Sequence, residues 1–102
     1  NGTTVKYVTE TYSDGTNWYR KWSDGWLEQG GFFGAVGDSR ITVTIPAPYA
    51  NAQYIIALSI NSASESTNVR IALRTLTYFN LERAHSADIS NGGSWYACGQ
   101  GA

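Results

Sequence analysis

The chain has 102 residues, of which 42% are apolar and 15% are charged, so it is predicted to fold as one domain with a single core. Four Trp, seven Tyr and eleven Gly favour strands and tight turns over helices. A net charge of −1 argues against nucleic acid as a partner, one cysteine excludes a disulfide-stapled scaffold, and no apolar run approaches the ~20 residues needed for membrane insertion.

Residues 1–30 are predicted to form three strands joined by two equivalent turns. Asp14-Gly15 and Asp24-Gly25 lie between strand-like runs, and Asp-Gly favours a two-residue type I′ turn, in which both residues have positive φ. Such turns fix the register. The first turn pairs Thr11 with Trp18, Thr9 with Arg20 and Tyr7 with Trp22, and the second pairs Trp22 with Leu27 and Lys21 with Glu28. Tyr7, Trp22 and Leu27 would then share one face, opposite Lys21 and Glu28.

The rest of the chain contains further runs in which apolar and polar residues alternate. Runs 39–45 and 53–61 are predicted strands, and the prolines at 46 and 48 end the first of them. Run 69–79 is the longest candidate strand, with a bulge or twist where its alternation changes parity, and 94–98 is a short strand. The expected inward residues of the first two runs are Ile41, Val43, Ile45, Tyr54, Ile56, Leu58 and Ile60.

The whole chain, 1–102, is expected to be one all-β domain. About seven or eight short strands separated by turn signals indicate an antiparallel β-sandwich, with a barrel as the alternative architecture. No charged-then-apolar export leader opens the chain, and a start at Asn1 is expected of a fragment of a longer protein.

Acidic and nucleophilic residues do not form a recognisable catalytic set in the sequence. Hydrolysis of a glycan needs two carboxyl groups roughly 5 to 9.5 Å apart, and only Glu10, Glu82 and Asp88 lack an evident structural role. His85 and Ser86 are neighbours of Asp88, but adjacent positions in a sequence do not supply the geometry of a triad. We therefore expect a binding module that is no enzyme and carries no cofactor or metal, with three copies of His85 around a threefold axis as an alternative metal site.

Aromatic residues are concentrated between positions 18 and 26. Trp18 and Trp22 are expected to lie in the core. Tyr19, on the opposite face, and Trp26, at a turn edge, are candidates for contact with a sister chain or for stacking on a sugar.

Residues 9–31 resemble a segment that recurs in the C-terminal domains of tail fibres and receptor-binding proteins of phages and prophages of Gram-negative bacteria. Residues 95–99, Trp-Tyr-Ala-Cys-Gly, are a second match near the end of the chain. The residues that match the first motif are Glu10, Tyr12, Gly15, Trp18, Tyr19, Arg20, Asp24, Gly25, Trp26, Glu28, Gln29, Gly30 and Gly31.

This resemblance implies a trimeric, β-sandwich-like head domain at the distal tip of a tail fibre in the virion. It implies adhesion to a bacterial surface receptor, either a polysaccharide such as lipopolysaccharide or an outer-membrane protein. The motif is expected to be scaffold, so receptor residues are sought mainly in the polar loops 50–53, 61–68 and 87–93. The candidates are Tyr19, Trp26, Asn51, Gln53, Asn61, Ser64, Glu65, Asn68 and Asn91.

Three other functions remain open at this point. The chain is alternatively a carbohydrate-binding or trimerisation module attached to a tailspike depolymerase. It is alternatively an enzyme acting on capsular or lipopolysaccharide sugars through Glu10, Glu82 or Asp88. A mainly structural cap that nucleates the fibre trimer and touches no receptor is the last alternative.

Overall fold

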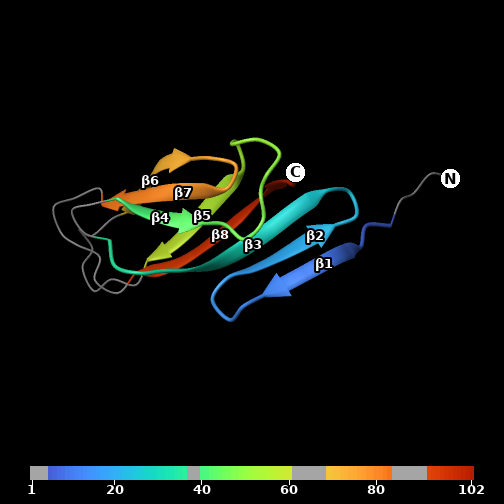
Figure 1. Cartoon of the computed structure of the whole chain (residues 1–102), viewed down its shortest axis with the longest axis horizontal. Helices are drawn as coiled ribbons and strands as arrows, with labels where there is room; N and C mark the ends of the chain where they lie inside the picture. Colours follow the sequence, from blue (N-terminus) through green and yellow to red (C-terminus); the bar gives the residue numbers. More distant parts are fainter. Residues whose placement is uncertain (1–4, 37–39, 61–68, 84–91) are drawn as a thin grey trace.

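The computed structural model describes residues 5–36, 40–60, 69–83 and 92–102, and these form eight strands in two antiparallel sheets (Figure 1). The sheets have the orders β1-β2-β3-β8-β5 and β4-β7-β6. The predicted all-β, sandwich-like fold with seven or eight strands is confirmed. The strands are β1 (Val8–Ser13), β2 (Trp18–Trp22), β3 (Trp26–Phe33), β4 (Ile41–Thr44), β5 (Ile55–Ile60), β6 (Val69–Arg74), β7 (Tyr78–Arg83) and β8 (Gly93–Gln100).

The core lies between the three-stranded sheet and one part of the five-stranded sheet. It includes Leu27 and Phe33 of β3, Trp95 of β8 and Phe79 of β7, all buried. The ring of Phe79 meets that of Trp95 edge-on, with centroids 5.3 Å apart, a favourable arrangement of two aromatic rings. None of these core residues comes from β1 or β2, and Figure 1 shows those two strands on the side of the molecule away from β4, β6 and β7.

A buried glutamine joins β3 to the segment that follows β4. Gln29 is fully buried, its side-chain N–H donates to the carbonyl of Ala47 at 2.9 Å, and its side-chain oxygen accepts from the N–H of Ala47 at 3.0 Å. Pro46 and Pro48 flank Ala47, and neither can donate a backbone hydrogen bond to a ladder. The glutamine amide therefore replaces the strand partner that this proline-containing segment lacks.

The first hairpin has a longer turn than the predicted two-residue type I′ turn. Thr11 lies opposite Arg20 rather than Trp18, and the turn comprises residues 14–17. The carboxylate of Asp14 accepts hydrogen bonds from the N–H groups of the last two turn residues, at 2.7 and 2.8 Å. No non-glycine residue has positive φ in the described part of the chain, so Asp14 cannot take its place in a type I′ turn. The predicted register is wrong by two residues because the aspartate side chain closes a wider turn.

The second hairpin differs from the prediction by one residue. Lys21 lies opposite Leu27 instead of Glu28, and the N–H of Gly25 donates to the carbonyl of Trp22 at 2.9 Å. With a φ of 89° at Gly25, this is a three-residue turn that ends in a glycine bulge. A one-residue slip moves every side chain to the other face of the strand. The predicted apolar row that joins Trp22 and Leu27 on one face is therefore wrong.

The predicted long strand 69–79 is a hairpin, β6 and β7, joined by residues 75–77. The hydroxyl of Thr75 accepts a hydrogen bond from the N–H of Tyr78 at 3.1 Å, and the N–H of Thr75 donates to the carbonyl of Tyr78 at 2.8 Å. Threonine supports such turns only weakly, and the segment has no Gly, Pro, Asn or Asp to signal one. The change of parity at Leu76 and Tyr78 therefore comes from this turn and not from the predicted bulge or twist, whereas the register of β6 shifts earlier, between Ile71 and Leu73.

The predicted alternation in the two middle strands is confirmed. Val43, Ile45 and Tyr54 are buried, and the half-buried Ile41, Ile56 and Leu58 pack against the core. The side chain of Ile60 lies outside the described residues. The short strand predicted at 94–98 is present and extends to Gly93–Gln100.

Candidate functional site

The outer face of the five-stranded sheet carries the tryptophans that the sequence analysis assigned in part to the core. Trp18 and Trp22 are half-buried on this face, and Trp26 lies there too, so the prediction that Trp18 and Trp22 are core residues is wrong. The cause is the one-residue slip of the second turn. Large apolar side chains next to them are exposed, at 63% for Phe32 and 61% for Ile55.

Glu28 lies at the centre of this face and connects its aromatic side chains. Its carboxylate accepts a hydrogen bond from the indole N–H of Trp22 at 2.6 Å and another from the hydroxyl of Tyr96 at 2.6 Å. Arg20, which lies directly opposite on β2, approaches it to 3.9 Å. Donors around a carboxylate stabilise its charged form, so the hydrogen bonds from Tyr96 and Trp22 lower the pKa of Glu28 below its usual range.

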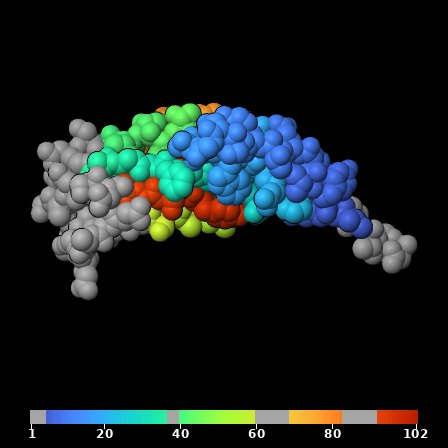
Figure 2. Space-filling view, turned by 90° about the horizontal axis from the view of Figure 1, so that it is seen from below, coloured from blue at the N-terminus to red at the C-terminus, as the bar shows by residue number. Residues whose placement is uncertain are grey.

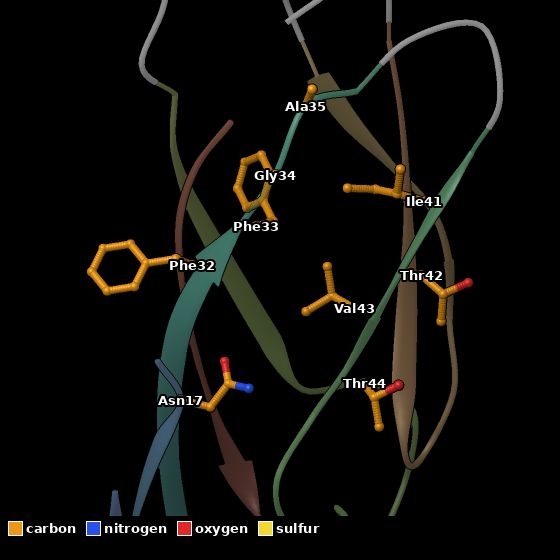
Figure 3. Close-up of a pocket in the computed structure, with 9 residues that line it drawn as sticks. All are labelled: Asn17, Phe32, Phe33, Gly34, Ala35, Ile41, Thr42, Val43 and Thr44. Carbon is orange, nitrogen blue, oxygen red and sulfur yellow. The ribbon is translucent and has the colours of Figure 1, made fainter. Parts of the chain in front are cut away.

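Two adjoining grooves lie where the ladder of β2 with β3 stops and β3 continues, and we call this region the β3 notch. The first groove encloses about 430 Å³ between β3 and β4. Phe33, Ile41 and Val43 point into it, whereas Phe32 points to the opposite side of β3 (Figure 3). The second groove encloses about 300 Å³ and shares Asn17 and Phe32 with the first. Its residues are Ser13, Gly15, Thr16, Asn17, Trp18, Gly31, Phe32, Ser94 and Trp95.

Gly30 and Gly31 allow neighbouring side chains to lie close to the backbone of β3 in the notch. A Cβ atom on Gly30 would lie 2.9 Å from the indole nitrogen of Trp18, and one on Gly31 would lie 2.0 Å from the side-chain oxygen of Asn17. Both distances are shorter than real side chains tolerate, so the two side chains occupy the space that any larger residue would need. Glycine in a strand interior marks such close approach. The glycine pair of the 9–31 motif thus allows Trp18 and Asn17 to lie against the strand.

The hairpin of β1 and β2 is a second region, whose inner side is largely uncovered except where Tyr19 packs against the core. All six residues of β1 are exposed, and the hairpin (blue in Figure 2) forms the surface over much of the molecule's length. On the inner side the rings of Tyr12 and Tyr19 stack with centroids 5.2 Å apart. The hydroxyl of Tyr19 donates to Glu10, which also pairs with Lys21 at 3.7 Å. The inner side of the hairpin therefore carries aromatic rings and one ion pair, Glu10 with Lys21, whose charges compensate each other.

Four of the nine predicted receptor residues lie within the described part of the chain, and these four do not gather in one place. Tyr19 is half-buried on the inner face of β2, whereas Trp26 lies on the outer face of β3 beside Lys6, whose Nζ is 5.9 Å from the ring centroid. Asn51 and Gln53 are exposed and lie in one turn, in which the N–H of Gln53 donates to the side chain of Asn51 at 2.9 Å. The other five candidates, Asn61, Ser64, Glu65, Asn68 and Asn91, lie outside the described residues.

One of the three loops that were expected to face the receptor lies wholly within the described residues. Loop 50–53 precedes the start of β5, next to the end of β8, because the N–H of Ala50 donates to the carbonyl of Gln100. Loop 61–68 and most of loop 87–93 lie outside the described residues.

The described carboxylates that seemed to lack a structural role do have charged or polar partners. Glu82 bridges Arg40 and Arg70 at 3.0 and 2.8 Å, and these contacts lower its pKa. Glu10 contacts Tyr19 and Lys21, while Asp88 and the predicted alternative ligand His85 lie outside the described residues. Among the described residues no group of three or more His, Cys, Asp or Glu is placed to hold a metal ion, and no helix of the described part is long and apolar enough to cross a membrane.

The residues of the notch were not among the sites predicted from the sequence. Phe32 and Asn17 lie there with Ser13, Thr16 and Ser94, and none of them was a candidate. A usable signal was present in the motif, since two adjacent glycines inside a strand indicate that something lies close to the backbone. What lies there is an aromatic and an amide side chain, placed by a turn of unexpected length.

The fold is similar to that of part of a pyocin tail fibre. An N-truncated R2-type pyocin tail fibre and the C-terminal part of the R2 pyocin fibre of P. aeruginosa each superpose with a TM-score of 0.62 at 17% sequence identity, and each match covers 95% of this chain. The chain spans 38% and 26% of the lengths of these two structures. No family model and no curated protein matches the sequence. The resemblance of the 9–31 motif to tail fibres is therefore supported at the level of the fold.

Proposed function

We propose that the chain is the receptor-binding tip domain of a tail fibre, acting as a homotrimer that attaches a virion to a bacterial surface glycan or outer-membrane protein. The observation that carries this proposal is the fold, which matches part of a tail fibre over 95% of the chain at a TM-score of 0.62. The tail-fibre motif at 9–31 supports the same conclusion independently of the superposition.

The exposed hairpin supports assembly with sister chains. β1 is the edge of the five-stranded sheet, and exposed apolar side chains lie along it at Tyr7, Val8 and Tyr12. An uncovered apolar edge strand invites pairing with another chain, and proteins usually cover or disrupt such edges. In a fibre with threefold symmetry the hairpin of each chain would be covered by its neighbour. The Glu10–Lys21 pair suits such a contact, since it leaves no uncompensated charge for a sister chain to meet.

We also propose that the domain acts by binding alone. A glycosidase needs one carboxylic acid with a raised pKa, which donates a proton to the leaving group. The pKa values of Asp14, Asp24, Glu28 and Glu82 are lowered, chiefly by hydrogen bonds from the backbone or from donor side chains. These groups are held as carboxylates, which is the wrong protonation state for a general acid. Incubation with capsule and lipopolysaccharide should accordingly release no reducing ends.

Adhesion is tested by binding the fluorescently labelled, assembled chain to a panel of Gram-negative strains that differ in surface polysaccharide. We expect binding to a subset of strains and competition by the purified surface glycan or outer-membrane fraction of those strains. An assembled chain that binds no strain of a broad panel would contradict the adhesive function. It would favour the alternative of a cap that only trimerises the fibre.

A further inference from the structure

We infer that the β3 notch is a binding site for neutral sugar residues of a bacterial surface glycan. This inference rests on the proposed adhesive function and assigns it to a place on the molecule. The notch comprises the two grooves of about 430 and 300 Å³ that share Asn17 and Phe32. Pockets of this size fall within the lower range of ligand sites in proteins.

The backbone of β3 offers hydrogen-bonding groups along the notch. β2 begins at Trp18, which lies opposite Gly30, so its ladder with β3 stops there, whereas β8 pairs with β3 as far as Phe33. The last three residues of β3, Gly31 to Phe33, therefore have a neighbouring strand on one side only. Strand edges present N–H and C=O groups that a ligand can use. Because successive residues of a strand direct their N–H and C=O groups to alternate sides, only alternate residues of this stretch offer these groups on the open side. That is too few for the ladder of an extended peptide but suits the hydroxyl groups of a sugar.

The side chains around the two grooves combine aromatic rings with neutral polar groups. Phe32 is 63% exposed and lines both grooves, with its ring on the side of β3 away from Phe33, and the indole nitrogen of Trp18 lies close to Gly30. The polar side chains that line the grooves are hydroxyls and an amide, from Ser13, Thr16, Asn17, Thr42, Thr44 and Ser94. Aromatic side chains with an apolar body and neutral donors and acceptors suit ligands that are apolar on one side and hydroxylated on the other.

The charge of the residues that line the notch indicates whether it suits a neutral or an acidic ligand. Among the residues that the structure describes, none that lines either groove is Asp, Glu, Lys, Arg or His. Asp14 is the nearest acid in the sequence, and its carboxylate is engaged by the backbone N–H groups of Thr16 and Asn17. A sugar acid would lose hydration in the notch without gaining a cationic partner, and burying an unpaired charge is costly. The notch should therefore select neutral sugars over uronic or sialic acids.

The test uses the assembled chain on an array of neutral and acidic bacterial polysaccharides. Phe32→Ala removes the exposed ring that lines both grooves, and Ile55→Ala is the matched control because its side chain is exposed to a similar extent, 61%, on the same sheet face outside both grooves. We expect Phe32→Ala to weaken binding to neutral glycans by about tenfold, in the range of an aromatic contact. Ile55→Ala should leave binding within about twofold of the parent chain. The indole N–H signal of Trp18 should shift in NMR spectra when the best neutral glycan of the array is added.

Three outcomes would overturn the inference. Equal binding by Phe32→Ala and the parent chain would exclude the notch, as would binding confined to acidic glycans. Attachment to cells through an outer-membrane protein, with no glycan bound on the array, would leave the adhesive function standing and remove the sugar site. An assembled chain that attaches to no bacterial surface would instead contradict the proposed function itself, and this inference with it.

Discussion

The two halves of the five-stranded sheet differ in how they are covered. The half formed by β3, β8 and β5 faces the second sheet and contributes Leu27, Phe33, Trp95 and Ala97 to the core. The half formed by β1 and β2 contributes no fully buried side chain, although β1 pairs with β2 and β2 with β3 in antiparallel ladders. Burial against the second sheet, and not strand pairing, therefore distinguishes the part of this sheet that is stabilised within one chain.

The two halves of the sheet therefore differ in how far their side chains are buried within one chain. In the covered half the buried Gln29 amide has both of its hydrogen bonds to the backbone of Ala47. The hairpin leaves the ring of Tyr12 and a free strand edge at the surface, and only Tyr19, on which Tyr12 stacks, packs against the core. We expect substitutions in the covered half to change the stability of one chain and substitutions in the hairpin to change assembly.

The largest effect is expected at Gln29. Gln29→Leu would leave the N–H and carbonyl of Ala47 buried without their partners, so the free energy of unfolding should fall by about 3 kcal/mol. Urea denaturation measures this as a lower midpoint with an unchanged slope. Gln53→Leu, at an exposed position, is the control and should change stability by less than about 0.5 kcal/mol. Equal effects of the two substitutions would remove the contrast between the halves.

A smaller effect, dependent on pH, is expected at Glu28. Its pKa in the folded chain lies below the ordinary 4.5, so its contribution to stability is present above pH 4.5 and is lost as the pH falls through the folded pKa. Glu28→Gln should therefore destabilise the chain by about 1.5 kcal/mol at pH 7 and much less at pH 3. Urea titrations at the two pH values provide the measurement. A difference between parent and variant that does not shrink at pH 3 would argue against the carboxylate as the cause.

The two hairpin turns should respond unequally to alanine. Gly15 and Gly25 both have φ near +90°, a conformation that costs an alanine about 1 kcal/mol. A Cβ on Gly25 would also lie 2.1 Å from the side-chain nitrogen of Gln100, whereas none of the described atoms lies within 4 Å of a Cβ on Gly15. Gly25→Ala should therefore lower the melting temperature more than Gly15→Ala. The reverse order would contradict the packing of β8 against this turn.

The smallest effect on stability is expected at Tyr12, on the hairpin. Its side chain is 42% exposed and contacts Tyr19 and Asp14 only within the hairpin, so Tyr12→Ser should change the stability of one chain by less than about 1 kcal/mol. The same substitution should raise the concentration at which the assembly dissociates, as measured by sedimentation. If Tyr12→Ser lowers stability and leaves assembly unchanged, the hairpin is stabilised within one chain, as the covered half is.

The sequence predicted those features that depend on local alternation. The inward residues Val43, Ile45 and Tyr54 were predicted correctly because one buried face imposes a period of two. The registers of the first two hairpins were predicted wrongly, since they depend on how the side chain of Asp14 closes the first turn and the bulge at Gly25 closes the second. The β6–β7 turn was missed because a single threonine hydroxyl, at Thr75, supports it.

The candidate site was predicted less well for the same reason. The one-residue slip at Gly25 reversed the face of Trp18 and Trp22, so two residues assigned to the core lie on the surface. The notch around Phe32 depends on where the ladder of β2 with β3 stops, and no local pattern records that. Site prediction here needed the register to within one residue, whereas the fold class needed only the number and type of strands.

The central claim, that the hairpin of one chain is covered by its neighbours in a threefold assembly, is tested most directly by light scattering coupled to size-exclusion chromatography. At micromolar concentration the account predicts a mass three times the 11.1 kDa of one chain. Hydrogen exchange on the same sample should show protection at β1 that is lost on dilution to the monomer. A stable species of 11.1 kDa at that concentration, with β1 unprotected, would contradict it.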